Sequence, residues 1–507
     1  VGPSDASRPL AMQPCDVDEL GNGRSDTEDA APKDPTAPSM SIFSEGRTLA
    51  LLYAVSFFDG ADCQLLPSSY RALEADLGLS PSLLAACALS QAMASAVSAP
   101  FWGSLADRRV LQPQQILMAG CASWGLITCA LALVEDTSTI LVLRLLNGLA
   151  TATLTPVTQA MIADLAPPQE RGRYFCWTGF AVNVGSMFTS SFSTAISQQK
   201  YTSWQISGWR ISFATIGLLS IALAPVLGAG IKPPRRSERE VHGRMLHYTS
   251  EEFSLFNEFR IFFGFFEVSS FGVIVLQGCF GVMPWSAMSF GSMFLQYAGL
   301  SDTTAGNLSS LLLFCCSLGN VLGGYIGDWL TSWSRFHGRP LTAQISASVG
   351  IPCALIFYKL IPRSPSSVPW FTLVLTIFGL CATWCDCGVN RPLLTEVVPE
   401  RSRARIMGLL SAIAGATGAL GGPLVALLAE NFFGYTTQHR PMALIPEDVR
   451  EKNLNALGNG IFLMCVVPWS ICLVFYSALH YTYPYDLMQL HKQHSGTEMS
   501  TAAKDGF

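Results

Sequence analysis

Stretches of about 20 apolar residues recur along most of this chain, and they constrain its fold more than any other feature. A helix of that length crosses a bilayer, where every backbone polar group must be satisfied without water. Twelve such stretches predict an all-α integral membrane protein of twelve transmembrane helices. They span residues 48–70, 80–103, 113–134, 139–163, 174–197 and 209–230, followed by 268–298, 303–328, 341–361, 368–391, 404–430 and 456–481.

The composition agrees with a membrane chain. Only 13% of the 507 residues are charged and 50% are hydrophobic, whereas about a quarter of the residues in a soluble domain are charged. The formal net charge of −5 is small for this length. Because no basic face is apparent, we expect no nucleic-acid partner.

Polar segments divide the chain into domains. Residues 1–46 are acidic and almost free of aromatic residues, which predicts a disordered tail. Residues 231–262 form a charged linker between two bundles, 47–230 and 263–482, and a second tail follows at 483–507. Phenylalanines at helical spacing late in this linker favour a helix on the membrane surface, and a disordered linker is the alternative.

The distribution of Lys and Arg among the loops predicts the orientation of the chain. Alternate loops on one side, together with the linker, hold most of these residues. Basic residues are retained on the cytoplasmic side of membranes. Both termini are therefore expected to be cytoplasmic in a multi-pass protein, while the sequence does not indicate which membrane holds it.

The two sets of six stretches share a layout. Residues 103–107 read Gly-Ser-Leu-Ala-Asp after the second stretch, and residues 324–328 read Gly-Tyr-Ile-Gly-Asp after the eighth. A Pro-x-x-x-Arg pattern follows the fourth stretch at 167–171 and the tenth at 399–403. Internal repeats of this kind are typical of secondary transporters.

At these residues the chain resembles the major facilitator superfamily, over residues 45–485. Residues 103–108 resemble its Gly-x-Leu-x-Asp-Arg signature, and residues 144–148 resemble its Arg-x-x-Gln-Gly signature with Asn147 in place of Gln. Residues 62–67, 277–286 and 390–392 are similar to a spinster-like branch common in plants and algae. The resemblance implies two six-helix bundles that move a solute by alternating access. We also expect a monomer.

Two departures from the resemblance bear on coupling. Spinster-like relatives carry Arg directly after the first-helix acid, where this chain has Gly60. The fifth stretch also lacks the Gly-Pro pair that is typical of proton antiporters. Neither a local ion pair at Gly60 nor antiport can therefore be assumed.

Asp59 and Asp62 are the candidates for proton coupling. Insertion of an ionisable residue deep in a membrane helix costs about 2.5–3.5 kcal/mol, so such a residue is a functional candidate. Residues three apart on a helix lie on the same face, and two neighbouring carboxylates favour the uptake of a proton. The alternative is that both lie near the interface and only hydrate a vestibule.

Arg144, Asn147, Gln277 and Trp285 are the candidate substrate-binding residues. Arg144 keeps its charge within an apolar stretch, so it must face a cavity, an acid or an anionic substrate. Its acid partner could be Asp59 or Asp62, or it could be a structural arginine near the surface. Gln277 and Trp285 lie on a helix that Pro284 and nearby glycines are expected to interrupt. Packing against lipid or a neighbouring helix is the alternative for Trp285.

The repeated loops predict a cytoplasmic gate. Asp107 should pair with Arg171 or Arg173, and Asp328 with Arg403 or Arg405. These pairs would break as the bundles rock. The alternative is that the basic loops only orient the chain. The full set of expected gate residues is Asp107, Arg108, Arg171, Arg173, Asp328, Arg403, Arg405 and Arg391.

Other functional classes find little support in the residues. All seven histidines fall in loops or at helix ends, and no Gly-x-x-x-x-Gly-Lys loop is present. Cys381, Cys385 and Cys387 have no histidine nearby, so no metal or other cofactor is expected. We therefore expect a carrier of an organic anion, a sugar-like solute or an amphipathic lipid, not an enzyme, with membrane lipids and protons as further partners. A non-transporting receptor on the same scaffold is the alternative.

Overall fold

The computed structural model describes residues 42–107, 111–166, 171–201, 206–231, 260, 262–398 and 400–504. Nearly all of them are helical, and one short antiparallel pair joins β1 (Lys200–Tyr201) to β2 (Ile206–Ser207). The residues from Phe43 onward pack as one compact unit. The tail at 1–46 and the linker at 231–262, with its expected surface helix, lie largely outside the described residues.

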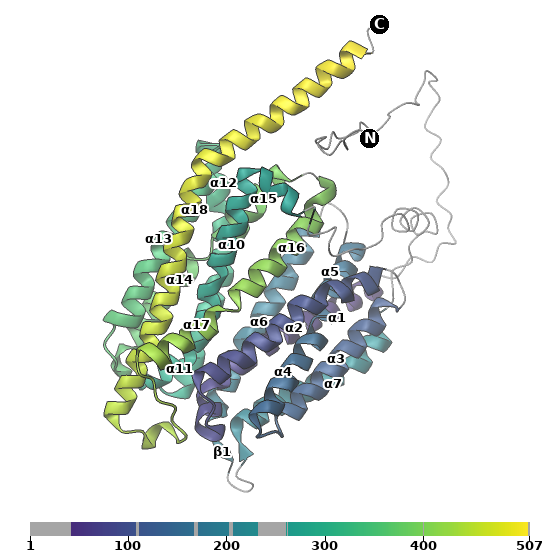
Figure 1. Ribbon diagram of the computed structural model, residues 1–507. Helices are drawn as coiled ribbons and strands as arrows, with labels where there is room; N and C mark the ends of the chain where they lie inside the picture. Colours follow the sequence, from purple (N-terminus) through teal and green to yellow (C-terminus); the bar gives the residue numbers. More distant parts are fainter. Residues whose placement is uncertain are drawn as a thin grey trace, which may run out of the picture. The chain divides into compact units, whose positions relative to one another are not determined.

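The first six spans follow the predicted order (Figure 1). Thr151 and Leu154 mark a short interruption within the fourth span, where α4 passes into α5. The helices are α1 (Ile42–Leu77), α2 (Pro81–Asp107), α3 (Pro113–Leu131), α4 (Thr137–Thr151), α5 (Leu154–Leu165), α6 (Arg171–Ser197) and α7 (Gly208–Gly230).

The second six spans are more often interrupted. α10 continues through Pro284, where an interruption was expected, and a 3-10 turn follows at Met288–Phe290 between α10 and α11. π-helical turns occupy Ile356–Leu360, Asp386–Asn390 and Leu428–Phe432. Further 3-10 turns lie at Phe265–Glu267, Pro365–Ser367 and Met442–Leu444. The helices are α10 (Ser269–Ala287), α11 (Gly291–Tyr297), α12 (Asp302–Trp333), α13 (Gly338–Leu355), α14 (Val368–Cys381), α15 (Arg391–Val397), α16 (Glu400–Gly418), α17 (Gly421–Leu427) and α18 (Glu447–Lys504).

Ten spans among the described residues are long and apolar enough to cross a membrane by themselves. The other two are α6 and the combination of α14 with α15. α6 is rich in Ser and Thr, whose hydroxyls bond helix backbone, as Ser186 does with the carbonyl of Gly60 at 2.9 Å. α14 is apolar but short, because the chain turns irregular at Ala382 before α15 begins. Both features shorten the continuous apolar stretch of the helix, and neither changes the order of the twelve spans.

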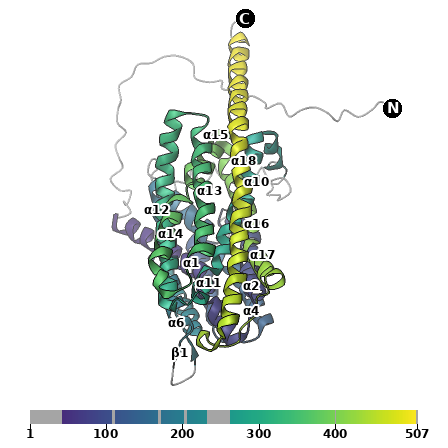
Figure 2. The same cartoon turned by 90° about the vertical axis from the view of Figure 1, so that its left-hand side faces the viewer.

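Two membrane faces can be distinguished. Ser270, at the start of α10, donates its backbone N–H to Asp486 of α18 at 2.6 Å. We call the face where α1 begins and α18 ends the terminal face, and the opposite one the far face (Figures 1 and 2). α2 ends at Asp107 and α12 ends shortly after Asp328, both at the terminal face, as the repeat requires. α18 continues as a helix past the predicted end at residue 481.

Close packing of α1 against α6 explains the departure at Gly60. A Cβ atom at Gly60 would lie 1.9 Å from the carbonyl oxygen of Val182, and one at Gly185 would lie 1.9 Å from that of Phe57. Small residues let membrane helices approach this closely. The arginine that spinster-like relatives carry has no room here.

Candidate functional site

Asp62 lies inside the first six helices and is 2% exposed. Its two carboxylate oxygens accept hydrogen bonds from different helices. Gln91 of α2 donates from Nε2 at 2.6 Å, and Trp124 of α3 donates from Nε1 at 2.9 Å. A buried carboxylate is tolerated only when it is satisfied in this way. Asp62 therefore anchors a polar cluster that ties α1 to α2 and α3.

Arg144 belongs to the same cluster and is 1% exposed. Its Nη1 atom donates to Gln91 Oε1 at 2.9 Å, and its guanidinium lies 5.2 Å from the ring centre of Phe213. Gln91 thus stands between Arg144 and Asp62, where a direct pair was one expectation. Among the described residues, the buried Nε and Nη2 atoms of Arg144 have no hydrogen-bond partner. Two donors of a permanently charged group remain available.

Asn147 completes the cluster one turn further along α4. It is fully buried, donates from Nδ2 to Thr128 Oγ1 at 3.2 Å, and accepts from Gln91 Nε2 at 3.4 Å. A Cβ atom at Gly148 would lie 2.2 Å from the backbone oxygen of Gln91. Only glycine permits this approach of α4 to α2, which brings the Gln91 side chain between Asp62 and Arg144.

Asp59 lies one turn before Asp62 and is half-buried. Thr155 of α5 donates to its Oδ2 atom at 3.2 Å. Asp59 therefore accepts from a hydroxyl, whereas Asp62 accepts from two N–H donors. The two acids face the interior of the first six helices but differ in the number and kind of donors that bond them.

Gln277 lies in a corresponding polar group of the second six helices and is 4% exposed. Its Oε1 atom accepts from Asn390 Nδ2 at 3.0 Å, and Tyr476 donates to Asn390 Oδ1 at 3.3 Å. Asn390 ends the π-helical turn at Asp386–Asn390, a kind of irregularity that is frequent at functional sites. In this conformation Gln277 contacts protein groups on both sides.

Trp285 lines a cavity of about 340 Å³ between α1 and the second six helices. Its ring centre lies 6.0 Å from that of Phe378, which lines the same cavity. None of the lining residues is charged. The other walls include aromatic residues and small polar ones: Phe357, Tyr358, Gln64, Ser289, Ser292 and Ser309. The cavity suits the apolar body of a solute that carries a few polar groups.

The gate residues are only partly described. Asp328 bonds Arg339 Nη2 at 3.1 Å, and Arg339 also donates from Nη1 to the carbonyl of Gly388 at 2.9 Å. Arg391 pairs with Asp386 at 2.9 Å at the exposed terminal face. Arg173 is exposed on the first turn of α6. The side chains of Asp107, Arg108, Arg171, Arg403 and Arg405 lie outside the described part, so the predicted pairs stay predictions.

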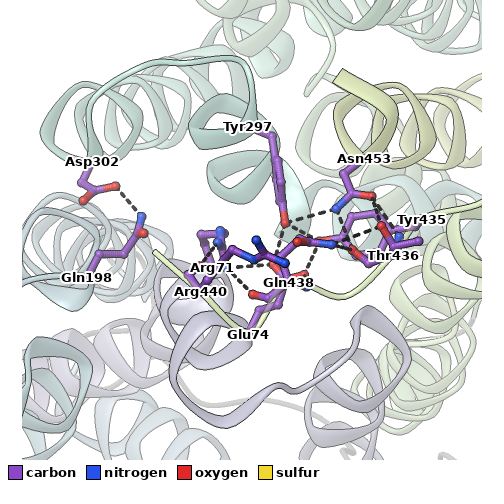
Figure 3. A network of polar contacts seen from close by, with 10 residues as sticks. All are labelled: Arg71, Glu74, Gln198, Tyr297, Asp302, Tyr435, Thr436, Gln438, Arg440 and Asn453. Atoms are coloured by element: carbon purple, nitrogen blue, oxygen red, sulfur yellow. Dashed lines mark hydrogen bonds and ion pairs between the residues drawn. The ribbon is translucent and has the colours of Figure 1, made fainter. Parts of the chain in front are cut away.

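Sequence reasoning missed a buried polar network at the far face. Arg71 and Glu74, three residues apart at the end of α1, contact Tyr297, Tyr435 and the loop after the π-helical turn at Leu428–Phe432 (Figure 3). Burial raises the pKa of the Tyr435 hydroxyl well above its usual value, so it stays protonated and donates. The available signal was an acid and a base at i,i+3 at the end of an apolar helix.

Comparison with known proteins agrees with the arrangement of these helices. The chain is 22% identical over 338 residues to the probable L-galactonate transporter of Escherichia coli, which covers 65% of this chain and 70% of that protein. It is 28% identical over 183 residues to the gallate transporter of Pseudomonas putida, which covers 35% of this chain and 38% of that protein.

The fold has close counterparts among solved structures. A bacterial homologue of the human lysosomal transporter Spinster, in an inward-facing and unoccupied conformation, superposes with a TM-score of 0.72 at 18% identity over 88% of this chain and 99% of that one. This agrees with the expected resemblance to spinster-like proteins and with the twelve-helix fold. The sequence profile of the Major Facilitator Superfamily matches residues 52–422, and the chain belongs to that family.

Proposed function

We propose that this chain is a secondary active transporter that moves a small organic anion across a membrane by alternating access. The observation that carries the proposal is Arg144, a fully buried guanidinium with two donors that no described residue accepts. Arginine matches the planar geometry of a carboxylate and forms two parallel hydrogen bonds with it. Asp62 balances the charge of Arg144 only through Gln91. Buried donors left without an acceptor are costly, so a binding role for Nε and Nη2 is the simplest explanation.

The names of the relatives support the same substrate class. L-galactonate and gallate are both carboxylates, one with a sugar-like body and one with an aromatic body. The uncharged cavity beside Trp285 would receive the body of such a solute. Arg144 would bind the carboxylate of the solute after α1 and α4 move. A neutral sugar or an amphipathic lipid would use the cavity without needing Arg144.

Proton coupling would pass through the acids of α1. Each carboxylate oxygen of Asp62 accepts an N–H hydrogen bond, so its protonation would break one of the two, whereas protonation of Asp59 disturbs at most a single hydroxyl contact. Asp59 is therefore the better proton acceptor of the two. Asp62 would hold Arg144 in position through Gln91.

The terminal face would be the cytoplasmic one, because the loops that hold most of the basic residues lie there. The described conformation, with its far face closed by the Arg71 and Glu74 network, would then be open toward the cytoplasm. On closure of the terminal face, Asp328 would exchange Arg339 for Arg403 or Arg405, and Asp107 would pair with Arg171 or Arg173.

A binding screen followed by counterflow tests the proposal. Purified protein would be heated with L-galactonate, gallate, galactose and a lysophospholipid, because a ligand of the folded state raises the unfolding temperature. We expect stabilisation by a carboxylate and not by galactose, and exchange of that carboxylate across proteoliposomes. Stabilisation by galactose or by the lipid alone would contradict the anion assignment. Binding without exchange would instead indicate a receptor.

A further inference from the structure

The far face holds a buried ion pair whose two members come from one helix. Arg71 and Glu74 of α1 have completely buried side chains and lie 3.1 Å apart, Nη1 to Oε2. The residues that hydrogen-bond to this pair across the bundle interface belong to the second six helices (Figure 3). The pair therefore faces the opposite bundle as a unit with no net charge.

Both carboxylate oxygens of Glu74 accept hydrogen bonds from the second six helices. Its Oε1 atom accepts from the Tyr435 hydroxyl at 2.7 Å and from the backbone N–H of Gln438 at 2.9 Å, and its Oε2 atom accepts from the Tyr297 hydroxyl at 2.9 Å. Arg71 donates in turn to the backbone carbonyls of Gln438 at 3.3 Å and Arg440 at 2.6 Å. The hydrogen-bonding groups that the second six helices present to Arg71 and Glu74 are thus neutral.

The loop that supplies these groups is itself fixed. Asn453 of α18 accepts from the backbone N–H of Thr436 at 2.9 Å and donates to its carbonyl at 2.7 Å. Gly434 has φ = +72°, a conformation that favours glycine and turns the chain directly before Tyr435. The donors and acceptors that meet Arg71 and Glu74 are therefore held in place before the bundles meet.

We propose that Arg71 and Glu74, with Tyr297, Tyr435 and the Gln438–Arg440 backbone, form the latch that keeps the far face closed. An ion pair shared between two bundles would leave an isolated charge on each when it broke, which is costly in a buried setting. Here Arg71 and Glu74 separate from the second six helices together and stay paired with each other in water. The opposite bundle keeps only hydroxyl and peptide groups, which water satisfies easily.

The latch is joined to the solute cavity through short lengths of two elements. Gln64 and Pro67 line the cavity within two turns of Arg71 on α1, and Ser292 and Leu295 line it just before Tyr297 on α11. Separation of Glu74 from Tyr297 therefore also moves two walls of the cavity apart. This coupling of solute to latch rests on the proposed function, whereas the latch itself does not.

Cys63 provides a native probe of the latch, because its thiol is exposed and lines the cavity. In a protein whose other cysteines are replaced, a membrane-impermeant maleimide would be applied to proteoliposomes from the far side. Removal of a hydrogen bond to a charged group should raise the far-side labelling rate about tenfold in Tyr435→Phe and at least as much in Glu74→Gln. Thr342→Val, which loses a buried hydroxyl bond within α13, should label at the parent rate.

Two results would overturn the latch. One is far-side labelling of Tyr435→Phe and Glu74→Gln at the parent rate. The other is an equal rise from both faces, which indicates loosened packing. Neither readout requires a transported solute, so failure of the latch and failure of the anion assignment are distinguishable.

A charge reversal separates the latch from a simple internal ion pair. The double variant Arg71→Glu with Glu74→Arg keeps an acid and a base at i,i+3 but presents the wrong group to each fixed donor and acceptor. We expect its far-side labelling to remain raised about tenfold or more, as in Glu74→Gln. Return of the labelling rate to the parent value would show that the pair alone closes the face and would contradict the latch.

Discussion

Arg144 donates a hydrogen bond to the side-chain oxygen of Gln91 at 2.9 Å, and the amide nitrogen of the same glutamine donates to Asp62 at 2.6 Å. One neutral side chain thus orients a buried cation and a buried anion from two other helices. The cluster keeps two guanidinium nitrogens of Arg144 free of partners among the described residues. This arrangement makes an anion site in the first six helices testable residue by residue.

Gln91→Met should damage both stability and transport. Methionine fills a similar volume but leaves Asp62 with Trp124 as its remaining strong donor and removes the acceptor of Arg144 Nη1. A buried polar group left unsatisfied costs about 1–3 kcal/mol, so the thermal unfolding midpoint in detergent should fall. Gln344→Met, which loses contacts to Ser477 and His480 at the edge of α13, should shift the midpoint less. An equal shift in both variants would show that the Gln91 cluster contributes no more to stability than the contacts of Gln344.

Asp59→Asn should remove the dependence of transport on a proton gradient while the protein stays folded. Asparagine cannot take up a proton, and it can keep the contact with Thr155. Uptake into proteoliposomes with an imposed pH gradient would be compared with uptake without one. Asp62→Asn should instead lower the unfolding midpoint, because its carboxylate holds two donors. A parent-like response of Asp59→Asn to the gradient would exclude this acid from coupling.

Trp285→Ala should weaken solute binding more than it slows turnover. The indole forms one wall of the uncharged cavity and packs near Phe378. Its loss enlarges the cavity without disturbing a charge, so KM should rise while kcat changes little. Trp370→Ala, at an exposed position at the start of α14, is the matched control. Unchanged KM in Trp285→Ala would place the solute elsewhere.

The twelve spans and their order could be predicted because apolar length is a local property of the sequence. The predicted stretch 209–230 and α7 at Gly208–Gly230 differ by one residue at the start. α18 was predicted too short, since the polar residues beyond Ser477 end an apolar run but do not end a helix. Hydropathy indicates which residues cross the membrane, whereas the length of a helix also depends on packing and backbone propensity.

The contacts that define the site are less predictable. Asp59 and Asp62 were both possible partners of Arg144, but Gln91, which bridges Asp62 to it, comes from a third helix whose orientation no local pattern fixes. The far-face network is harder still, because Glu74 and Tyr435 are 361 residues apart. The carbonyl partners of Arg71 belong to backbone that any sequence would supply, so no residue type points to them.

The most direct test of the account compares counterflow of an organic acid with that of its uncharged methyl ester, in the parent and in Arg144→Lys. The acid would be the one that stabilises the purified protein. Arg210→Lys is the control, because Arg210 is engaged by Glu135 at 3.2 Å and by the Ala132 carbonyl at 2.9 Å at the far face. We predict that the parent and Arg210→Lys exchange the acid and not the ester, and that Arg144→Lys exchanges neither, since lysine cannot form the bidentate contact. Exchange of acid and ester at equal rates by the parent, or normal exchange of the acid by a folded Arg144→Lys protein, would contradict the account.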